Sequence, residues 1–129
     1  MAIPPGELPT RTVIQTLPNV SVPGGGSRVS PFIDVPLGAK AIDALVDGSS
    51  WPPNTQISVL TELTVNNGAT ILTSARSTHT NVGASSNIYG TGYRFSKEGN
   101  TDQNLRIRAT VTVLSAGSIT LVGTIGVTN

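Results

Sequence analysis

The residues that decide the fold are NLRIRATVTVLSAGSITLVGTIGV, residues 104–127. Apolar side chains occupy every second position over residues 105–113 and again over residues 119–127, on either side of the segment 115–118. Because successive side chains on a strand point to opposite faces, this alternation gives each half one apolar face. Two such strands around a short glycine-containing segment predict an antiparallel hairpin. A lone hairpin is marginal in water, so its apolar face needs a second sheet, and the stretch predicts a β-sandwich.

The preceding residues continue the pattern of short strands separated by turns. Residues 56–65 alternate, and Asn66-Asn67-Gly68 is the strongest turn signal in the chain, because Asn and Gly tolerate the positive φ of tight hairpins. The partner strand is expected over residues 69–76, and the polar, glycine-rich residues 77–92 predict a long loop. Shorter strands are expected at residues 32–35, 41–46 and 93–95, although the alanines of 41–46 also allow a helical turn. The sequence therefore predicts an all-β, antiparallel, jelly-roll-like β-sandwich of about seven or eight strands.

Composition narrows the classes of function. A chain of 129 residues fits one domain, and its 4% aromatic content leaves the core to Val, Ile, Leu and Ala. The net charge of +1 gives no electrostatic reason to expect a nucleic acid or a membrane as partner. No cysteine is present, which excludes disulfides, zinc–thiolate sites and cysteine nucleophiles. The first residues lack the features of a secretory signal, and no apolar run approaches the roughly 18 residues of a membrane span.

Residues 1–31 differ from the rest and predict an extended N-terminal arm ahead of a sandwich domain at residues 32–129. Seven of the nine prolines lie within residues 4–36, and proline biases the chain toward extended geometry. Residues 11–17 could make one short strand and residues 20–22 another, and Gly24-Gly25-Gly26 then gives a flexible joint. One interpretation is a disordered or surface-draped tail; the other is an arm that binds a neighbouring subunit through its apolar side chains, namely Ile3, Leu8, Val13, Ile14, Leu17, Val20 and Val22.

A search for catalytic, metal-binding and cofactor-binding patterns predicts no such site, so a non-enzymatic protein without cofactor is expected. His79 is the only histidine and is expected to be exposed on a loop. No Gly-x-Ser-x-Gly elbow, dinucleotide fingerprint or phosphate loop is present. The acidic and amide residues of 97–104 leave a calcium site open as an alternative to a plain solvated turn.

Five residues are candidate surface contacts: Trp51, Tyr89, Tyr93, Arg106 and Arg108. Trp51 has two interpretations, a cap on the end of the core or an exposed anchor for a partner. Arg106 and Arg108 share one strand face, where they either meet an acidic partner or keep the outer face soluble, and the second role is favoured.

Residues 32–127 resemble small β-sandwich proteins of tailed bacteriophage virions, including capsid decoration or cement proteins. The resemblance lies in the strand leading to Pro36-x-Gly38, in Trp51-Pro52, in the stretch Glu62 to Thr70 around Asn67-Gly68, and in the late strand Leu105 to Thr112. It implies a protein made in the host cytoplasm that binds the outside of the capsid at junctions between coat subunits. The implied partner is the major capsid protein, with self-association as a dimer or trimer to multiply weak contacts.

A carbohydrate- or receptor-binding module of a phage fibre or a bacterial surface protein is the alternative. Such modules use the same sandwich and expose aromatic side chains, and Trp51, Tyr89 and Tyr93 would supply that platform.

Overall fold

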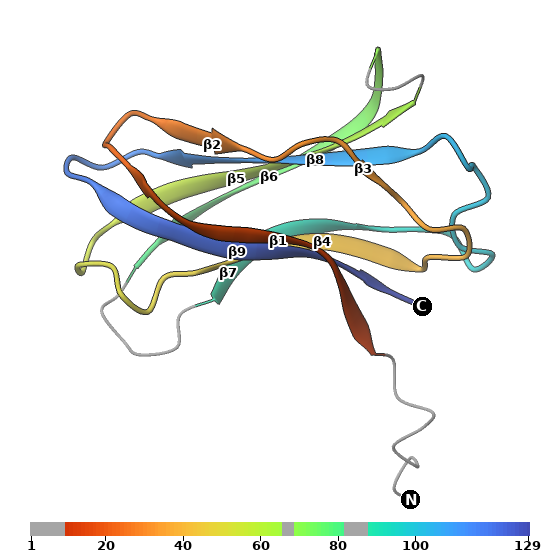
Figure 1. Cartoon of the computed structure of the whole chain (residues 1–129), viewed down its shortest axis with the longest axis horizontal. Coiled ribbons are helices and arrows are strands. Elements are labelled where there is room, and N and C mark those ends of the chain that lie inside the picture. The colour runs from red at the N-terminus through yellow and green to blue at the C-terminus, as the bar shows by residue number, and fades with distance from the viewer. Residues whose placement is uncertain (1–9, 66–68, 82–87) are drawn as a thin grey trace, which may run out of the picture.

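The computed structural model describes residues 10–65, 69–81 and 88–129, and these residues form strands joined by turns (Figure 1). The strands are β1 (Arg11–Val22), β2 (Ser27–Val29), β3 (Ile33–Asp34), β4 (Ala41–Asp47), β5 (Gln56–Val65), β6 (Thr70–Thr80), β7 (Ile88–Arg94), β8 (Arg106–Val113) and β9 (Ile119–Thr128). The described part of the chain contains no helix, so the all-β prediction is confirmed, including a strand where a helical turn over residues 41–46 was the alternative.

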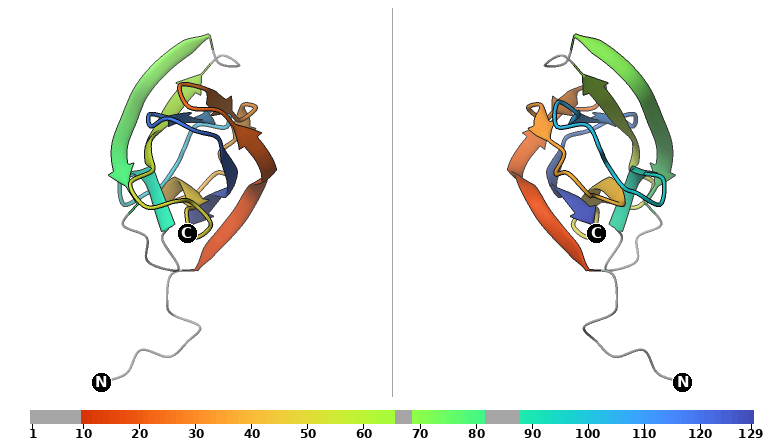
Figure 2. Two further views of the ribbon diagram at one scale, coloured as in Figure 1. Left: turned by 90° about the vertical axis from the view of Figure 1, so that its left-hand side faces the viewer. Right: turned by 90° about the vertical axis from the view of Figure 1, so that its right-hand side faces the viewer.

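The strands form two antiparallel sheets that face each other. Sheet A has the order β1-β9-β4-β7, and sheet B has the order β2-β8-β5-β6, with β3 also paired to β8. Because β2 and β3 both pair with β8, they act as two pieces of one edge strand, and each sheet has four strand positions. This order is that of a jelly roll. Viewed end-on, the two sheets curve around a common interior (Figure 2).

The predicted hairpin over residues 104–127 is wrong in its pairing, although both strands exist. β8 pairs with β5 in sheet B, whereas β9 pairs with β1 and β4 in sheet A, so residues 114–118 carry the chain from one sheet to the other. Alternation of apolar residues does not distinguish a hairpin from two strands in different sheets, because each strand buries one face in both arrangements. Each of the two strands lies between neighbours within its own sheet, and their apolar faces meet across the core.

The core lies between the sheets and is built from the inward positions of the central strands. Ile42, Ile57, Ile107, Leu121 and Ile125 are its largest fully buried apolar side chains. Each alternates along its strand with a more exposed neighbour in β4, β8 and most of β9, which is the period of two that the sequence shows. The aliphatic core predicted from the low aromatic content is therefore confirmed.

The N-terminal strand corrects the predicted arm. Residues 11–22 form β1, which pairs with β9 from Arg11↔Thr128 to Val22↔Ile119. Leu17 and Val22 are buried and Ile14 packs against the core, whereas Val13 and Val20 are exposed. The prolines are tolerated because β1 is an edge strand and Pro18 lies at an irregularity of the pairing. The boundary at residue 31 is thus wrong, while Ile3 and Leu8 lie outside the described residues.

The remaining strand predictions differ mainly in length. β5 has the bounds expected for residues 56–65, and its pairing with β6 confirms a hairpin whose turn, residues 66–68, lies outside the described residues. The predicted loop over residues 77–92 is wrong at both ends, because β6 continues to Thr80 and β7 begins at Ile88. Polar and glycine residues are compatible with strands here because β6 and β7 are edge strands.

Candidate functional site

Trp51 lies at one end of the sandwich, in the connection after β4. It is only 5% exposed, and its indole Nε1 donates a 2.8 Å hydrogen bond to the Thr120 carbonyl oxygen. Its ring stacks on that of Tyr89, with 5.9 Å between centroids and 14° between planes. Of the two interpretations of Trp51, the cap on the end of the core is confirmed and the exposed anchor is wrong, because the ring is buried and its N–H has a hydrogen-bond acceptor.

Tyr89 belongs to the same end of the core. Its hydroxyl donates to Asn81 Oδ1 at 3.1 Å, and the buried Asn81 donates from Nδ2 to the carbonyl oxygens of Trp51 and Pro52 at 3.0 and 3.1 Å. These bonds tie β7 to the connection before β5. Tyr89 is half-buried, and its ring and hydroxyl are both used by partners within the chain.

His79 and Ser77 on β6 contact the edge strand β7 of the other sheet. Ser77 Oγ lies 2.8 Å from His79 Nε2 and donates to the Gly90 carbonyl oxygen at 3.0 Å, while the His79 ring lies 5.1 Å from Tyr89. The expectation of an exposed loop histidine is wrong, because residue 79 lies on β6 and is half-buried. Among the described residues, the polar partners of its ring are Ser77 and the Gly90 carbonyl oxygen. The contact with Gly90 links β6 of sheet B to β7 of sheet A.

Arg106 and Arg108 each have a carboxylate on a neighbouring strand. Arg106 Nε lies 3.0 Å from Asp34 Oδ1, and Arg108 Nη2 lies 3.0 Å from Glu62 Oε1. The Arg108 guanidinium also lies 4.7 Å from the centroid of the Phe32 ring, within cation–π range. Both side chains are therefore engaged in ion pairs within sheet B, and their role as surface contacts stays a prediction.

The turn over residues 97–104 is organised by hydrogen bonds of Asn100. Asn100 is buried and donates from Nδ2 to the carbonyl oxygens of Val35, Pro36 and Asp102, at 3.0–3.3 Å. Its Oδ1 accepts from the Asp102 backbone N–H at 3.0 Å. Within the described residues, no group of three or more histidine, cysteine or acidic side chains is placed to hold a metal ion.

Tyr93 is the one predicted aromatic contact that is largely accessible. It is 40% exposed, and its ring lies edge-on to that of Phe95, with 5.1 Å between centroids. The three aromatic residues expected to form a platform are therefore not assembled on one surface, since two of them face inward.

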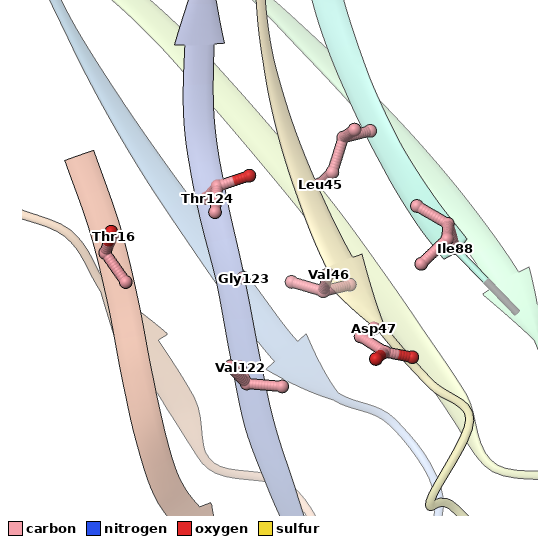
Figure 3. Close-up of a pocket in the computed structure, with 8 residues that line it drawn as sticks. All are labelled: Thr16, Leu45, Val46, Asp47, Ile88, Val122, Gly123 and Thr124. Carbon is pink, nitrogen blue, oxygen red and sulfur yellow. The ribbon is translucent and has the colours of Figure 1, made fainter. Parts of the chain in front are cut away.

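The outer face of sheet A has a hollow of about 380 Å³, called the apolar hollow below (Figure 3). Its lining comes from all four strands of the sheet: Thr16, Leu45, Val46, Asp47, Ile88, Val122, Gly123 and Thr124. Strand register explains the assembly, because Thr124 is opposite both Thr16 and Leu45, and Asp47 is opposite Ile88. Ile88 is 56% exposed and is one of several large apolar side chains that the described residues leave accessible.

Charge is confined to the rim of the apolar hollow. Asp47 is its only ionisable lining residue, and Asp47 Oδ1 accepts a 2.9 Å hydrogen bond from the Ser49 backbone N–H. This bond, aided by the Ser49 side chain, lowers the pKa of Asp47, so the carboxylate is ionised at neutral pH. The hollow therefore presents an apolar surface with one negative charge at its edge.

Because residue 90 is glycine, the Leu45 side chain can pack directly against the backbone of β7. A Cβ at residue 90 would lie 2.1 Å from the Ala44 carbonyl oxygen and 2.6 Å from Leu45 Cδ2. Sequence reasoning missed Leu45, Ile88 and Val122 as residues that line a hollow. One signal was present, because Val122 interrupts a series of outward threonines on β9, Thr120, Thr124 and Thr128.

Comparison of the sequence with models of known protein families gives no match, and comparison with curated proteins gives none either. The described residues include no helix that is long and apolar enough to cross a membrane.

Proposed function

We propose that this chain is a structural protein of a bacteriophage virion, a decoration or cement protein that binds the outside of the capsid where coat subunits meet. The observation that carries the proposal is the apolar hollow on the outer face of a jelly-roll sheet, with Ile88 exposed beside it. The jelly roll is a fold of viral capsid domains and lectins, which supports a binding role for its outer face. The role is mechanical and needs no catalytic residue.

The proposed partner is the major capsid protein, which would insert an apolar side chain into the hollow. One such contact is weak, because a hollow of about 380 Å³ lies near the lower end of the size range of ligand pockets. Repetition over a symmetric shell, with self-association of the protein as a dimer or trimer, multiplies weak contacts into high avidity. Burial at subunit junctions would then oppose opening of the shell.

The carbohydrate- or receptor-binding alternative has less support. It needs an exposed aromatic platform, and of its three candidate residues Trp51 is buried and Tyr89 is committed to stacking and a hydrogen bond. Tyr93 alone has an accessible ring, beside Phe95.

Co-sedimentation with capsids that lack the protein tests the proposal. Ile88→Asp places a charge beside the apolar hollow and should weaken binding strongly, whereas Val29→Asp, an equally exposed valine on β2 of the other sheet, should leave it unchanged. Failure of the unmodified protein to sediment with any such capsid refutes the function. Equal binding by both variants would instead move the contact away from sheet A.

A further inference from the structure

The first part of β6 presents two large apolar side chains to solvent. Ile71 and Leu72 are 54% and 57% exposed, and they are the only consecutive residues among the exposed large apolar side chains of the described residues. Leu63 is opposite Thr73 and Thr64 is opposite Ile71, so Leu72 is an extra residue on β6, as in a β-bulge. The bulge interrupts the alternation that would otherwise turn one of the two side chains inward.

This apolar pair lies at an end of sheet B that projects from the sandwich. β8 pairs with β5 only as far as Thr64, whereas β5 and β6 remain paired up to Val65 and Thr70. The ends of these two strands extend beyond the other strands (Figures 1 and 2). Side chains here can therefore approach a second molecule ahead of the body of the sandwich.

A positive charge lies on the same surface as the apolar pair. Thr73 is opposite the buried Leu63, so Leu72 and Arg76 both point to the outer face of sheet B. Arg76 is exposed, and no ion pair within the described part of the chain involves it. The surface formed by Ile71, Leu72 and Arg76, called the β6 surface below, therefore combines two apolar side chains with one accessible cation.

The apolar hollow on sheet A has the complementary composition. Leu45, Ile88 and Val122 supply much of its apolar lining, and Asp47 is its one ionisable lining residue. The Asp47 carboxylate is ionised at neutral pH and, among the described residues, takes part in no ion pair. Each surface therefore offers apolar side chains to the other, together with a charge of opposite sign.

The spacing of these groups also agrees. On β6, Leu72 and Arg76 are four residues apart, which is about 13 Å at ~3.3 Å per residue. Across the hollow, Thr16 on β1 lies two strand spacings of ~4.8 Å from Leu45 on β4, and Asp47 lies two residues beyond Leu45, which separates Thr16 from Asp47 by roughly 12 Å. Arg76 can therefore reach Asp47 while Leu72 covers the far side of the hollow.

We propose that the β6 surface of one copy docks in the apolar hollow of a second copy, with Ile71 and Leu72 against the apolar lining and Arg76 beside Asp47. The proposal rests on the self-association that is part of the proposed function, and it names the two surfaces that meet. Because these surfaces differ, the contact is head-to-tail. In a dimer of this kind one hollow is filled, and the other stays open to a coat subunit.

Sedimentation velocity tests the contact in the absence of capsids. The average mass of the unmodified protein should increase with concentration up to the millimolar range. Leu72→Asp and Ile88→Asp should each remain monomeric, because the first places a charge on the β6 surface and the second places one in the hollow. Val29→Asp, at a similarly exposed position on β2, should associate like the unmodified protein.

A mixture of the two monomeric variants tests the head-to-tail arrangement directly. Leu72→Asp retains an intact hollow and Ile88→Asp retains an intact β6 surface, so the mixture should form a dimer that contains one molecule of each and grows no further. Charge reversal gives a second test. Arg76→Glu should weaken association about fivefold, and adding Asp47→Arg to the same chain should restore it.

Three results would overturn the proposal. An unmodified protein that stays monomeric over the whole concentration range removes the contact. Association of Ile88→Asp as strong as that of the unmodified protein would show that the hollow is not the receiving surface. A mixture that stays monomeric would exclude the head-to-tail arrangement. Co-sedimentation of the unmodified protein with capsids is measured separately, so any of these results would leave capsid binding standing, and circular dichroism confirms that each variant is folded.

Discussion

Removal of residues 1–26 tests whether the N-terminal residues are a dispensable arm or a strand that the sandwich needs in order to fold. If these residues were an arm, the truncated protein would fold as well as the full chain. In the structure, the deletion removes β1 and leaves one side of β9 without its partner. We therefore expect the truncated protein to be unfolded or aggregated, whereas removal of residues 1–9 alone should leave the sandwich folded.

The magnitude follows from what β1 buries. Leu17 and Val22 are 5% and 4% exposed, and burial of each such side chain contributes roughly 1.5–3 kcal/mol. Their loss costs about 3–6 kcal/mol before the exposure of apolar groups on β9 is counted. A domain of this size is stable by about 5–15 kcal/mol, so the deletion consumes a large part of that stability.

A point substitution measures the same effect without changing the length of the chain. Leu17→Ala should destabilise the fold by about 3 kcal/mol, which lowers Tm by roughly 10 °C, whereas Val13→Ala on the exposed side of β1 should change Tm by less than about 2 °C. Thermal unfolding followed by circular dichroism gives both values. A protein lacking residues 1–26 that still unfolds cooperatively within a few degrees of the full chain would refute the assignment of β1 to sheet A.

Three further outcomes follow from the polar contacts. Asn100→Ala removes a buried donor from three carbonyl oxygens and should cost about 1–3 kcal/mol in urea unfolding. Glu62→Gln removes the charge of a buried carboxylate that accepts hydrogen bonds from Arg108 and should cost about 1–3 kcal/mol, with little dependence on salt because the carboxylate is shielded from solvent. Because the Ser49 N–H lowers the pKa of Asp47 in the folded state, the stability that Asp47 contributes is present at neutral pH and is lost as the pH falls through that lowered pKa. Asp47→Asn should therefore be less stable than the parent at neutral pH and converge with it in strongly acidic solution.

The fold class was predictable because apolar residues recur with a period of two along β5, β8 and β9. That period identified β5, β8 and β9 nearly to the residue. It did not reveal that β8 and β9 belong to different sheets, because inward positions are apolar in either topology. The pairing depends on which strands lie beside each one, and that is a long-range property which alternation within one segment does not encode.

The edge strands were the least predictable elements. An edge strand has one unpaired side and tolerates proline, glycine and polar residues, so β1 and β7 resemble an arm and a loop in sequence. The signal that β1 belongs to the sandwich was the presence of Leu17 and Val22, which are too apolar to be left in water. The same apolar side chains predict contact with a neighbouring subunit, whereas in the structure their strand pairs with β9 of the same chain.

The apolar hollow shows why the candidate site was harder to predict than the fold. It is built from outward positions on four strands that are neighbours only after folding, from Thr16 on β1 to Val122 on β9. On any single strand, one apolar outward residue is ordinary, and the surface becomes unusual only when Leu45, Ile88 and Val122 are brought into one patch. Sequence reasoning therefore favoured aromatic side chains, which were individually conspicuous, yet Trp51 contributes to the end of the core instead. A surface made of residues that are unremarkable one by one is best tested by a charge substitution within its lining, which is why Ile88→Asp is more informative than any change at Trp51.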